Sequence, residues 1–350
     1  MKKLLLFFIS FMFVPVAFAN DGVSCSQMQD VIGSRPVNIS VIKMCKDSPY
    51  KLKLTFGEGK ITNLRRVEYF SQNENSVAAL NASYFKQDTG TPVGLCIFEG
   101  KLFSGPLFNR CVFGIDKNQR YFIENVSLQG NLRYSRENIR ISSINQPIVC
   151  SDGAYLYNYQ WGMHTPSKEA CYHFAVINNR ITEVSSSSIP VPEDGYAVVV
   201  PKACVKDAPK VSSLVRYSYG LSPRKFCKVD YAFAAGPWLV KNGQKYIDYE
   251  AQKFSKFFAI AKTARSAIGI DEQGNVFLVA VDGKQKGVSE GVSLYEMADI
   301  MLNLGAVDAM NLDGGSSTQM VYQGRLINIP TNKYGAAVTN AVVIVKEEEE

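Results

Sequence analysis

The chain has 350 residues, 38 basic and 32 acidic side chains, and a formal net charge of +6. This mild excess of positive charge does not argue for a nucleic-acid-binding protein. The length is ample for a sizeable core and fits one large domain or two small ones.

The first residues have the features of a secretory signal peptide. Lys2 and Lys3 precede an apolar run over residues 4–16, and Ala17-Phe18-Ala19 is an Ala-x-Ala cleavage pattern. The run is short for a bilayer span, which needs about 20 residues, although an uncleaved anchor is the alternative. We therefore predict a signal peptide over residues 1–19 and a secreted or periplasmic protein, with a bacterial source favoured. No membrane span is expected after its removal.

Eight cysteines lie between Cys25 and Cys227. An even number in an exported chain predicts disulfides, and no C-x-x-C pair points to zinc or to a thioredoxin-like site. Sequence does not fix the connectivity. We expect four local bridges between sequence neighbours: Cys25–Cys45, Cys96–Cys111, Cys150–Cys171 and Cys204–Cys227.

Short strand-like runs separated by Gly, Asn, Asp and Pro dominate the chain, for example over residues 51–56, 121–123 and 197–200. The predicted fold class is α+β, with a β-rich mixed sheet and few helices. The expected organisation is an N-terminal segment over residues 20–74, a main domain over 75–346 and an acidic tail over 347–350.

One stretch departs from this pattern and predicts a βαβ unit near residues 275–313. Residues 276–281 form a continuous apolar run, as in a strand buried on both faces. Ser293 and Glu296 then form a capping box, and apolar residues recur at helical spacing before Gly305. A second strand follows over residues 306–312. The two strands should run parallel with a right-handed crossover.

This geometry places Asp282 and Asp313 at the carboxyl ends of two parallel strands. Ligand sites in open α/β sheets form at that edge, so the two aspartates are a candidate acidic pair. The alternative is that each begins a turn, because Asp-Gly commonly does so.

The segment after Asp313 combines two glycines with three hydroxyl side chains: Gly314, Gly315, Ser316, Ser317 and Thr318. Consecutive N–H groups in a glycine-rich turn can bind an anion, although a simple hairpin turn remains the alternative. Arg265 stands alone in a small, apolar run, where an arginine either binds phosphate or carboxylate or forms a structural ion pair. Asn81 ends another apolar run.

These stretches, in this order, resemble the phosphodiester glycosidase family over roughly residues 75–346. The resemblance rests on residues 81–85 (Asn-Ala-Ser-Tyr-Phe), 235–239 (Ala-Gly-Pro-Trp-Leu), 265–269 (Arg-Ser-Ala-Ile-Gly), 281–284 (Val-Asp-Gly-Lys), 311–318 (Asn-Leu-Asp-Gly-Gly-Ser-Ser-Thr) and 337–341 (Ala-Val-Thr-Asn-Ala). Departures from the family pattern are Ala82 and Ser83 in place of two glycines, one glycine fewer after Asp313, Lys284 for an arginine, and Ala336-Ala337 for Arg-Pro.

The resemblance implies a hydrolase that cleaves the glycosidic bond of a sugar-1-phosphate diester. Diesters of N-acetylglucosamine 1-phosphate are one candidate class of substrate. Asp313 would be the nucleophile or general base, and Asp282 the second carboxylate, assisting or holding Arg265. The phosphate would be bound by Arg265 and the turn of residues 314–318. Asn81 and Asn340 would bind sugar hydroxyls or orient the carboxylate. The expected partner is a carbohydrate or phosphosugar, with no cofactor and no metal.

Two other classes of function remain open. One is a non-catalytic envelope protein that binds glycan or phosphorylated polymer, favoured by the lost glycines. The other is an inert, disulfide-rich structural domain. A histidine-based mechanism is disfavoured, because His164 and His173 lie in the cysteine-rich middle, on either side of Cys171, and no G-x-S-x-G elbow occurs.

Overall fold

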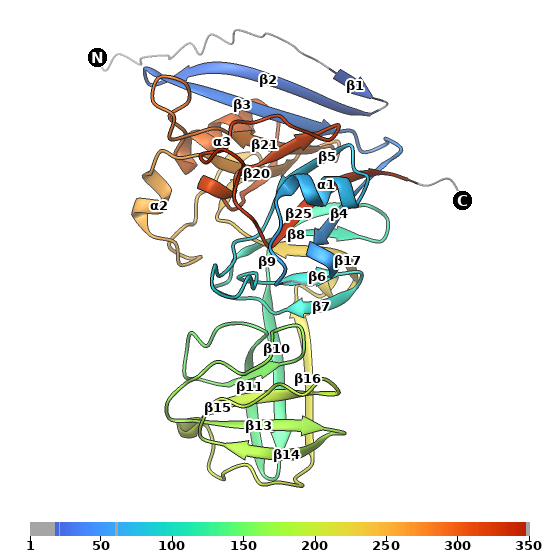
Figure 1. Ribbon diagram of the computed structural model, residues 1–350, viewed down its shortest axis with the longest axis vertical. Coiled ribbons are helices and arrows are strands. Elements are labelled where there is room, and N and C mark those ends of the chain that lie inside the picture. The colour runs from blue at the N-terminus through green and yellow to red at the C-terminus, as the bar shows by residue number, and fades with distance from the viewer. Residues whose placement is uncertain (1–17, 21, 60–61, 348–350) are drawn as a thin grey trace.

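The computed structural model describes residues 18–20, 22–59 and 62–347. Most of the predicted signal peptide, residues 1–17, and the end of the acidic tail, residues 348–350, lie outside the described residues. Figure 1 shows a larger body that carries both ends of the described chain, and a smaller unit that extends from it. None of the helices in the described part is long and apolar enough to cross a bilayer.

The described residues form 25 β-strands, three α-helices and four short 3-10 helices, which confirms the β-rich prediction with few helices. The α-helices are α1 (Val67–Asn73), α2 (Lys256–Ile260) and α3 (Leu294–Asn303). The 3-10 helices are η1 (Gly57–Gly59), η2 (Lys202–Cys204), η3 (Arg224–Lys228) and η4 (Gly315–Ser317).

An eight-stranded sheet forms the upper layer of the body. Across the sheet its strands are β1 (Phe18–Asn20), β2 (Val23–Ile32), β3 (Arg35–Met44), β21 (Val276–Val281), β20 (Arg265–Ile270), β22 (Asp308–Asn311), β18 (Trp238–Lys241) and β19 (Gln244–Lys245). β21 and β22 each pair antiparallel with β20, so they run in the same direction with one strand between them. Every residue of β20 and β21 is buried, and the continuous apolar run of β21 requires this.

Helix α3 connects β21 to β22 and covers one face of this sheet. Its capping box is present as predicted: the Ser293 hydroxyl accepts from the N–H of Glu296 at 3.3 Å, and the N–H of Ser293 donates to the Glu296 carboxylate at 2.8 Å. Gly305 follows the helix with a φ of 91°, a conformation that glycine adopts without strain. The predicted apolar stripe is buried at Leu294, Met297, Ile300 and Met301.

A five-stranded sheet packs against the other face. Its strands, in order, are β24 (Arg325–Leu326), β23 (Met320–Tyr322), β5 (Ala78–Asn81), β25 (Asn340–Lys346) and β4 (Tyr50–Phe56). Side chains from both sheets, such as Leu80 and Ile268, share one core. Helix α1 covers the outer face. Because β3 and β4 precede residue 75, both sheets continue across the boundary predicted between the N-terminal segment and the main domain.

A third sheet extends the same core. Its strands are β7 (Lys101–Ser104), β6 (Cys96–Phe98), β17 (Val229–Ala234), β8 (Cys111–Asp116) and β9 (Tyr121–Asn125). Phe113 and Phe233 from this sheet are fully buried in the core that the first two sheets share. The three sheets therefore form one body.

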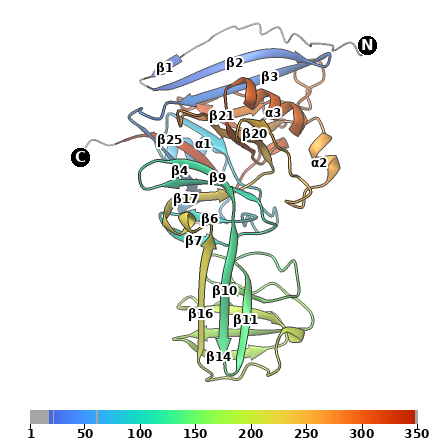
Figure 2. The ribbon, with the colours of Figure 1, turned by 180° about the vertical axis from the view of Figure 1, so that it is seen from behind.

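The smaller unit is built from residues 127–222, with separate cores of its own. Its sheet order is β14 (Arg180–Ser185), β13 (Cys171–Ile177), β15 (Gly195–Pro201), β12 (Ala154–Tyr157), β11 (Glu137–Ile144), β10 (Ser127–Tyr134) and β16 (Val215–Ser222). A bridge between Arg180 and Leu214 brings the two outermost strands together, so the sheet curls around its core. Figure 2 shows β10 and β16 side by side where the unit leaves the body.

All eight cysteines are free thiols in the structure, which differs from the four local bridges predicted. Cys25 pairs with Ile42 in the β2–β3 register, so Cys45 lies three residues further along, about 10 Å by strand rise. β17 lies between the strands that carry Cys96 and Cys111. Disulfide geometry needs Cα atoms within about 7 Å, which these two predicted pairs do not meet.

Candidate active site

Asp313 lies where the two main sheets meet. It directly follows Leu312, whose N–H donates to the carbonyl of Ser266 on β20 at 2.8 Å. The N–H of Asp313 itself donates to the carbonyl of Ala82, just after β5, at 3.0 Å. The side-chain amide of Asn81 donates to the Asp313 carbonyl at 2.6 Å. Strands from both sheets therefore hold the backbone of this aspartate.

The carboxyl group of Asp313 has a shifted proton affinity. Burial raises its pKa to about 6, although hydrogen bonds from the Ser317 side chain and the Gly314 N–H, together with the charge of Arg110, act in the opposite direction. The Gly314 N–H lies 2.9 Å from the carboxylate. A carboxylate with a pKa in this range can accept a proton from water or attack a carbon centre near neutral pH.

The turn after Asp313 packs tightly against the start of β20. Gly315 has a φ of 63°, and its N–H donates to the carbonyl of Ala264 at 2.8 Å. A Cβ on Gly314 would lie 2.8 Å from that same carbonyl oxygen, which excludes a side chain there. The N–H groups of Ser317 and Thr318 also donate to backbone carbonyls. Ser316 is the exposed residue of this turn and is open to a ligand, whereas Ser317 and Thr318 are buried.

Asp282 lies on the other side of Ala264, since a Cβ on Gly283 would be 2.2 Å from the Ala264 nitrogen. The two Asp-Gly turns thus flank the entry to β20, at the same sheet edge. With β20 between their strands, Asp282 and Asp313 are about 10 Å apart at Cα, twice the spacing of neighbouring strands.

The Asp282 carboxylate is buried and is bound within the protein. It accepts from the Asn328 side chain at 3.1 Å and from the N–H of Ile329 at 2.9 Å. Burial raises its pKa to about 6, opposed by these hydrogen bonds. Asn328 also accepts from the N–H of Met320 at 2.7 Å. Asp282 therefore connects the turn at residues 282–283 to Asn328, which in turn bonds to Met320, shortly after the Gly314-Gly315 turn.

Arg265 is the first residue of β20 and is 1% exposed. Its guanidinium donates to the carbonyls of Val292 at 3.2 Å, Phe258 at 2.7 Å and Ala261 at 3.1 Å, and stacks on the Phe258 ring at 4.7 Å. Within the described residues it makes no ion pair with a carboxylate. Arg265 thereby connects α2 to the residues before α3. Although Arg265 pairs with Val281, the neighbour of Asp282, no hydrogen bond or ion pair joins Arg265 to Asp282 within the described residues.

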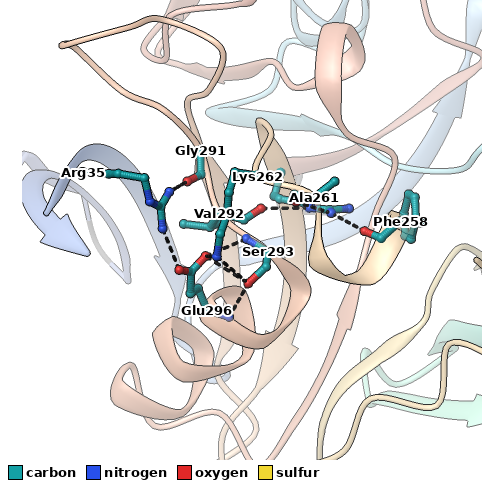
Figure 3. Close-up of polar contacts among 9 residues, drawn as sticks. Arg35, Phe258, Ala261, Lys262, Gly291, Val292, Ser293 and Glu296 are labelled. Atoms are coloured by element: carbon teal, nitrogen blue, oxygen red, sulfur yellow. Dashed lines mark hydrogen bonds and ion pairs between the residues drawn. The ribbon is translucent and has the colours of Figure 1, made fainter. Parts of the chain in front are cut away.

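Figure 3 shows this region, where α2 approaches the start of α3. Glu296 accepts from Arg35 at 2.6 Å and from Lys262 at 2.5 Å while it caps its own helix. Burial opposes ionisation of Glu296, but Lys262 and Ser293 lower its pKa below the ordinary value. Glu296 therefore connects the start of α3 to Arg35 on β3 and to Lys262, which follows α2.

Asn81 and Asn340 are both fully buried with their amides satisfied inside the protein. The Asn81 oxygen accepts from the Ser266 hydroxyl at 2.7 Å, while its nitrogen donates to Asp313. The Asn340 oxygen accepts from the N–H of Ser83 at 2.9 Å, and its nitrogen donates to the Ser83 hydroxyl at 3.2 Å. Of the two predicted roles, this arrangement fits orientation of the site rather than contact with sugar hydroxyls.

Two side chains at the site were not among the predicted site residues. The Tyr84 hydroxyl lies 2.8 Å from the Gly236 carbonyl and accepts from the Asn311 amide at 2.7 Å. Burial and the charge of Asp313 raise the Tyr84 pKa well above its ordinary value. Arg110 packs over the same ring, 5.1 Å from its centroid. Tyr84 stood in the family-like motif, but no local signal marked Arg110.

Comparisons with known proteins agree with the resemblance in the motifs. Residues 173–345 match the sequence model of the phosphodiester glycosidase family. Over 105 residues the chain is 37% identical to human N-acetylglucosamine-1-phosphodiester alpha-N-acetylglucosaminidase, a segment that covers 27% of this chain and 20% of the human protein. The match thus spans about a fifth of the length of this curated relative.

Solved structures share the fold. A hypothetical protein from Synechocystis superposes with a TM-score of 0.82 at 23% identity, covering 92% of this chain and 62% of that one. The catalytic domain of zebrafish N-acetylglucosamine-1-phosphodiester alpha-N-acetylglucosaminidase, auto-inhibited by its pro-peptide, gives a TM-score of 0.53 at 17% identity, covering 95% and 85%. The segment over residues 173–345, which includes Arg265, Asp282 and Asp313, is therefore similar to the phosphodiester glycosidase family.

Proposed function

We propose that this protein is an exported hydrolase that cleaves the glycosidic bond of a sugar-1-phosphate diester, with N-acetylglucosamine 1-phosphate as the first sugar to test. The observation that carries the proposal is Asp313, a half-buried carboxylate with a pKa of about 6 at the meeting of two sheets, inside the segment that matches the family. Export is supported by the signal-like residues 1–19, and envelope or extracellular glycans are the proposed substrates.

In the proposed reaction the bond between the anomeric carbon and the phosphodiester oxygen breaks. The electron pair of that bond leaves with the oxygen, which becomes part of a phosphate monoester. Water supplies the hydroxyl group of the free sugar, and its remaining proton is released to solvent, directly or by way of the Asp313 carboxylate. Because a phosphate is a good leaving group, the site needs a carboxylate for the anomeric centre and positive charge for the phosphate more than a strong general acid.

Asp313 is the residue proposed to act on the anomeric carbon or on the attacking water. Asp282, Asn81 and Asn340 are proposed as positioning residues, because their polar atoms bond to the segments that carry the site. The hydroxyl of Ser316 is proposed to contact the substrate. Arg265 contributes a buried positive charge, and its hydrogen bonds keep α2 in place.

The test is release of free sugar by the purified chain. Wild-type protein and Asp313→Asn are incubated with a methyl diester of N-acetylglucosamine α-1-phosphate, and N-acetylglucosamine is quantified. Asp152→Asn, which changes an exposed carboxylate in the smaller unit, is the matched control. Release by wild type and the control, with loss in Asp313→Asn, supports the proposal. Equal release by all three proteins would remove Asp313 from the mechanism, and no release from a panel of sugar phosphodiesters would favour a glycan-binding protein.

A further inference from the structure

Arg110, directly before β8, is a buried arginine whose guanidinium lacks hydrogen-bond acceptors. The residue is 9% exposed, and its Nε and Nη1 atoms are buried with no partner. Within the described residues its side chain makes no hydrogen bond and no ion pair. A charged donor that is removed from water without an acceptor is energetically unfavourable.

Aromatic rings compensate for part of this loss. The guanidinium lies 4.4 Å from the ring centroid of Phe254, 5.1 Å from that of Tyr84 and 5.4 Å from that of Phe108. The ring faces attract the cation, but they do not accept hydrogen bonds in the plane of the guanidinium. The positive charge is therefore held in place while its donors remain open.

The negative charge that faces Arg110 belongs to Asp313. Each affects the proton affinity of the other, but they are too far apart to form an ion pair. Tyr84 lies beside both, with its ring under Arg110 and its hydroxyl near the backbone of Leu312, at 3.0 Å. Tyr84 thus connects the guanidinium of Arg110 to the segment that carries Asp313.

We propose that Arg110 binds the phosphate of the sugar phosphodiester, next to the anomeric carbon on which Asp313 acts. This assignment rests on the proposed function. A phosphate presents paired oxygens that match the planar donors of an arginine, and it supplies the acceptors that Arg110 lacks. Arg265 is less suited to this contact, because its Nε and Nη2 atoms already donate to three carbonyls.

The experiment measures phosphate binding and turnover in the full chain. Isothermal titration with inorganic phosphate compares wild type, Arg110→Met and Arg110→Lys. Arg120→Met is the matched control, because Arg120 is 69% exposed on the β8–β9 turn and its loss changes the charge equally. We expect Arg110→Met to weaken phosphate binding about 10- to 100-fold and Arg110→Lys to weaken it less, since loss of a charge-assisted pair has this magnitude. Arg120→Met should bind as wild type does.

A second measurement separates phosphate binding from a structural role. The sugar phosphodiester is compared with the 4-nitrophenyl α-glycoside of the same sugar, whose leaving group is uncharged before cleavage. Arg110→Met should raise KM or lower kcat/KM for the phosphodiester about 10- to 100-fold while leaving the binding of free N-acetylglucosamine unchanged. If Arg110→Met does not fold, Arg110→Lys provides the same comparison.

The outcomes distinguish this inference from the proposed function. Equal phosphate affinity in wild type and the Arg110 variants, or absence of phosphate binding by wild type, overturns the assignment of Arg110 even if sugar is released. An equal loss with the phosphodiester and the neutral glycoside overturns it as well. If phosphate binding depends on Arg110 but the wild-type protein hydrolyses no diester, the result supports Arg110 as an anion-binding residue and contradicts the proposed hydrolase activity.

Discussion

The N–H of Asp313 donates to the carbonyl of Ala82 at 3.0 Å, which joins the end of β22 to the end of β5. These two residues are far apart in sequence and belong to different sheets. Asn81, the neighbour of Ala82, donates to the carbonyl of Asp313 in return, at 2.6 Å. Two sequence motifs are therefore one structural unit, and the backbone of the candidate catalytic residue is fixed from both sheets.

Asp313→Asn should abolish most of the activity while leaving the fold intact. The amide retains the shape of the side chain but cannot act as a base or nucleophile. We expect kcat to fall at least about 100-fold, the magnitude associated with loss of a positioned acid–base group. Circular dichroism and the unfolding temperature confirm folding, and a folded variant with wild-type kcat would contradict the assignment.

Activity should decline in acid with an apparent pKa near 6. Asp313 acts in its ionised form, and burial raises its pKa to about 6, so kcat/KM should decrease about tenfold per pH unit below that value. The phosphodiester remains an anion throughout this range. Asp282 has a similar pKa, so Asp282→Asn is the control: it should keep the acidic limb if Asp313 is its source.

The same shift has a consequence for stability. A folded-state pKa above the unfolded value means that the folded protein binds the proton more tightly, so this contribution is fully present below pH 3.8 and is lost as the pH rises through about 6. Removing the charge with Asp313→Asn should therefore raise the unfolding temperature relative to wild type at pH 8 more than at pH 4. Thermal denaturation at the two pH values measures this difference, and a larger gain at pH 4 would contradict it.

Asn81→Ala should weaken both the fold and the activity. The substitution leaves the Asp313 carbonyl and the Ser266 hydroxyl without their partner in a buried region. We expect the free energy of unfolding to fall by about 1–3 kcal/mol, and kcat to fall more than KM changes because the carboxylate loses its fixed position. Urea unfolding and steady-state kinetics measure the two effects. Asn131→Ala, at an exposed strand position, is the control.

Arg265→Met should loosen α2 rather than simply remove a charge. Three backbone carbonyls would lose their donor, two of them in and directly after this helix. Hydrogen exchange over residues 256–261 should become faster, and the free energy of unfolding should fall by about 1–3 kcal/mol for each carbonyl left buried without a partner. Unchanged exchange in that segment would show that Arg265 does not hold it.

Local sequence signals predicted the parts of the structure that depend on neighbouring residues. Ser293 and Glu296 specify the start of α3 by themselves, and the apolar run at 276–281 specifies a strand buried on both faces. Asp282 and Asp313 were placed at one sheet edge because each ends such a run. The intervening strand β20 was not predicted, and it is what separates the two carboxylates.

Contacts between distant segments could not be read in the same way. Arg110 owes its environment to Tyr84 and Phe254, which are brought to it only by the packing of separate loops. Spacing along the chain suggested pairing for the cysteines, but the strand register determines their separation in space, as for Cys25 and Cys45. The sequence marked Arg265 as a candidate binding residue. Its acceptors are backbone carbonyls, which the pattern of side chains cannot predict.

The smaller unit enters and leaves the body through a single pair of strands. Ser127 and Ser222 stand opposite each other in the β10–β16 register, which places their Cα atoms about 5 Å apart. The entire unit is in this sense one greatly enlarged hairpin loop. A short turn between these two serines would bridge the same gap in the chain. The unit nevertheless also bonds to the body, since the side chains of Asn145 and Gln146 donate to the carbonyls of Phe103 and Gly94. A change inside the loop would therefore reach the body through these two residues.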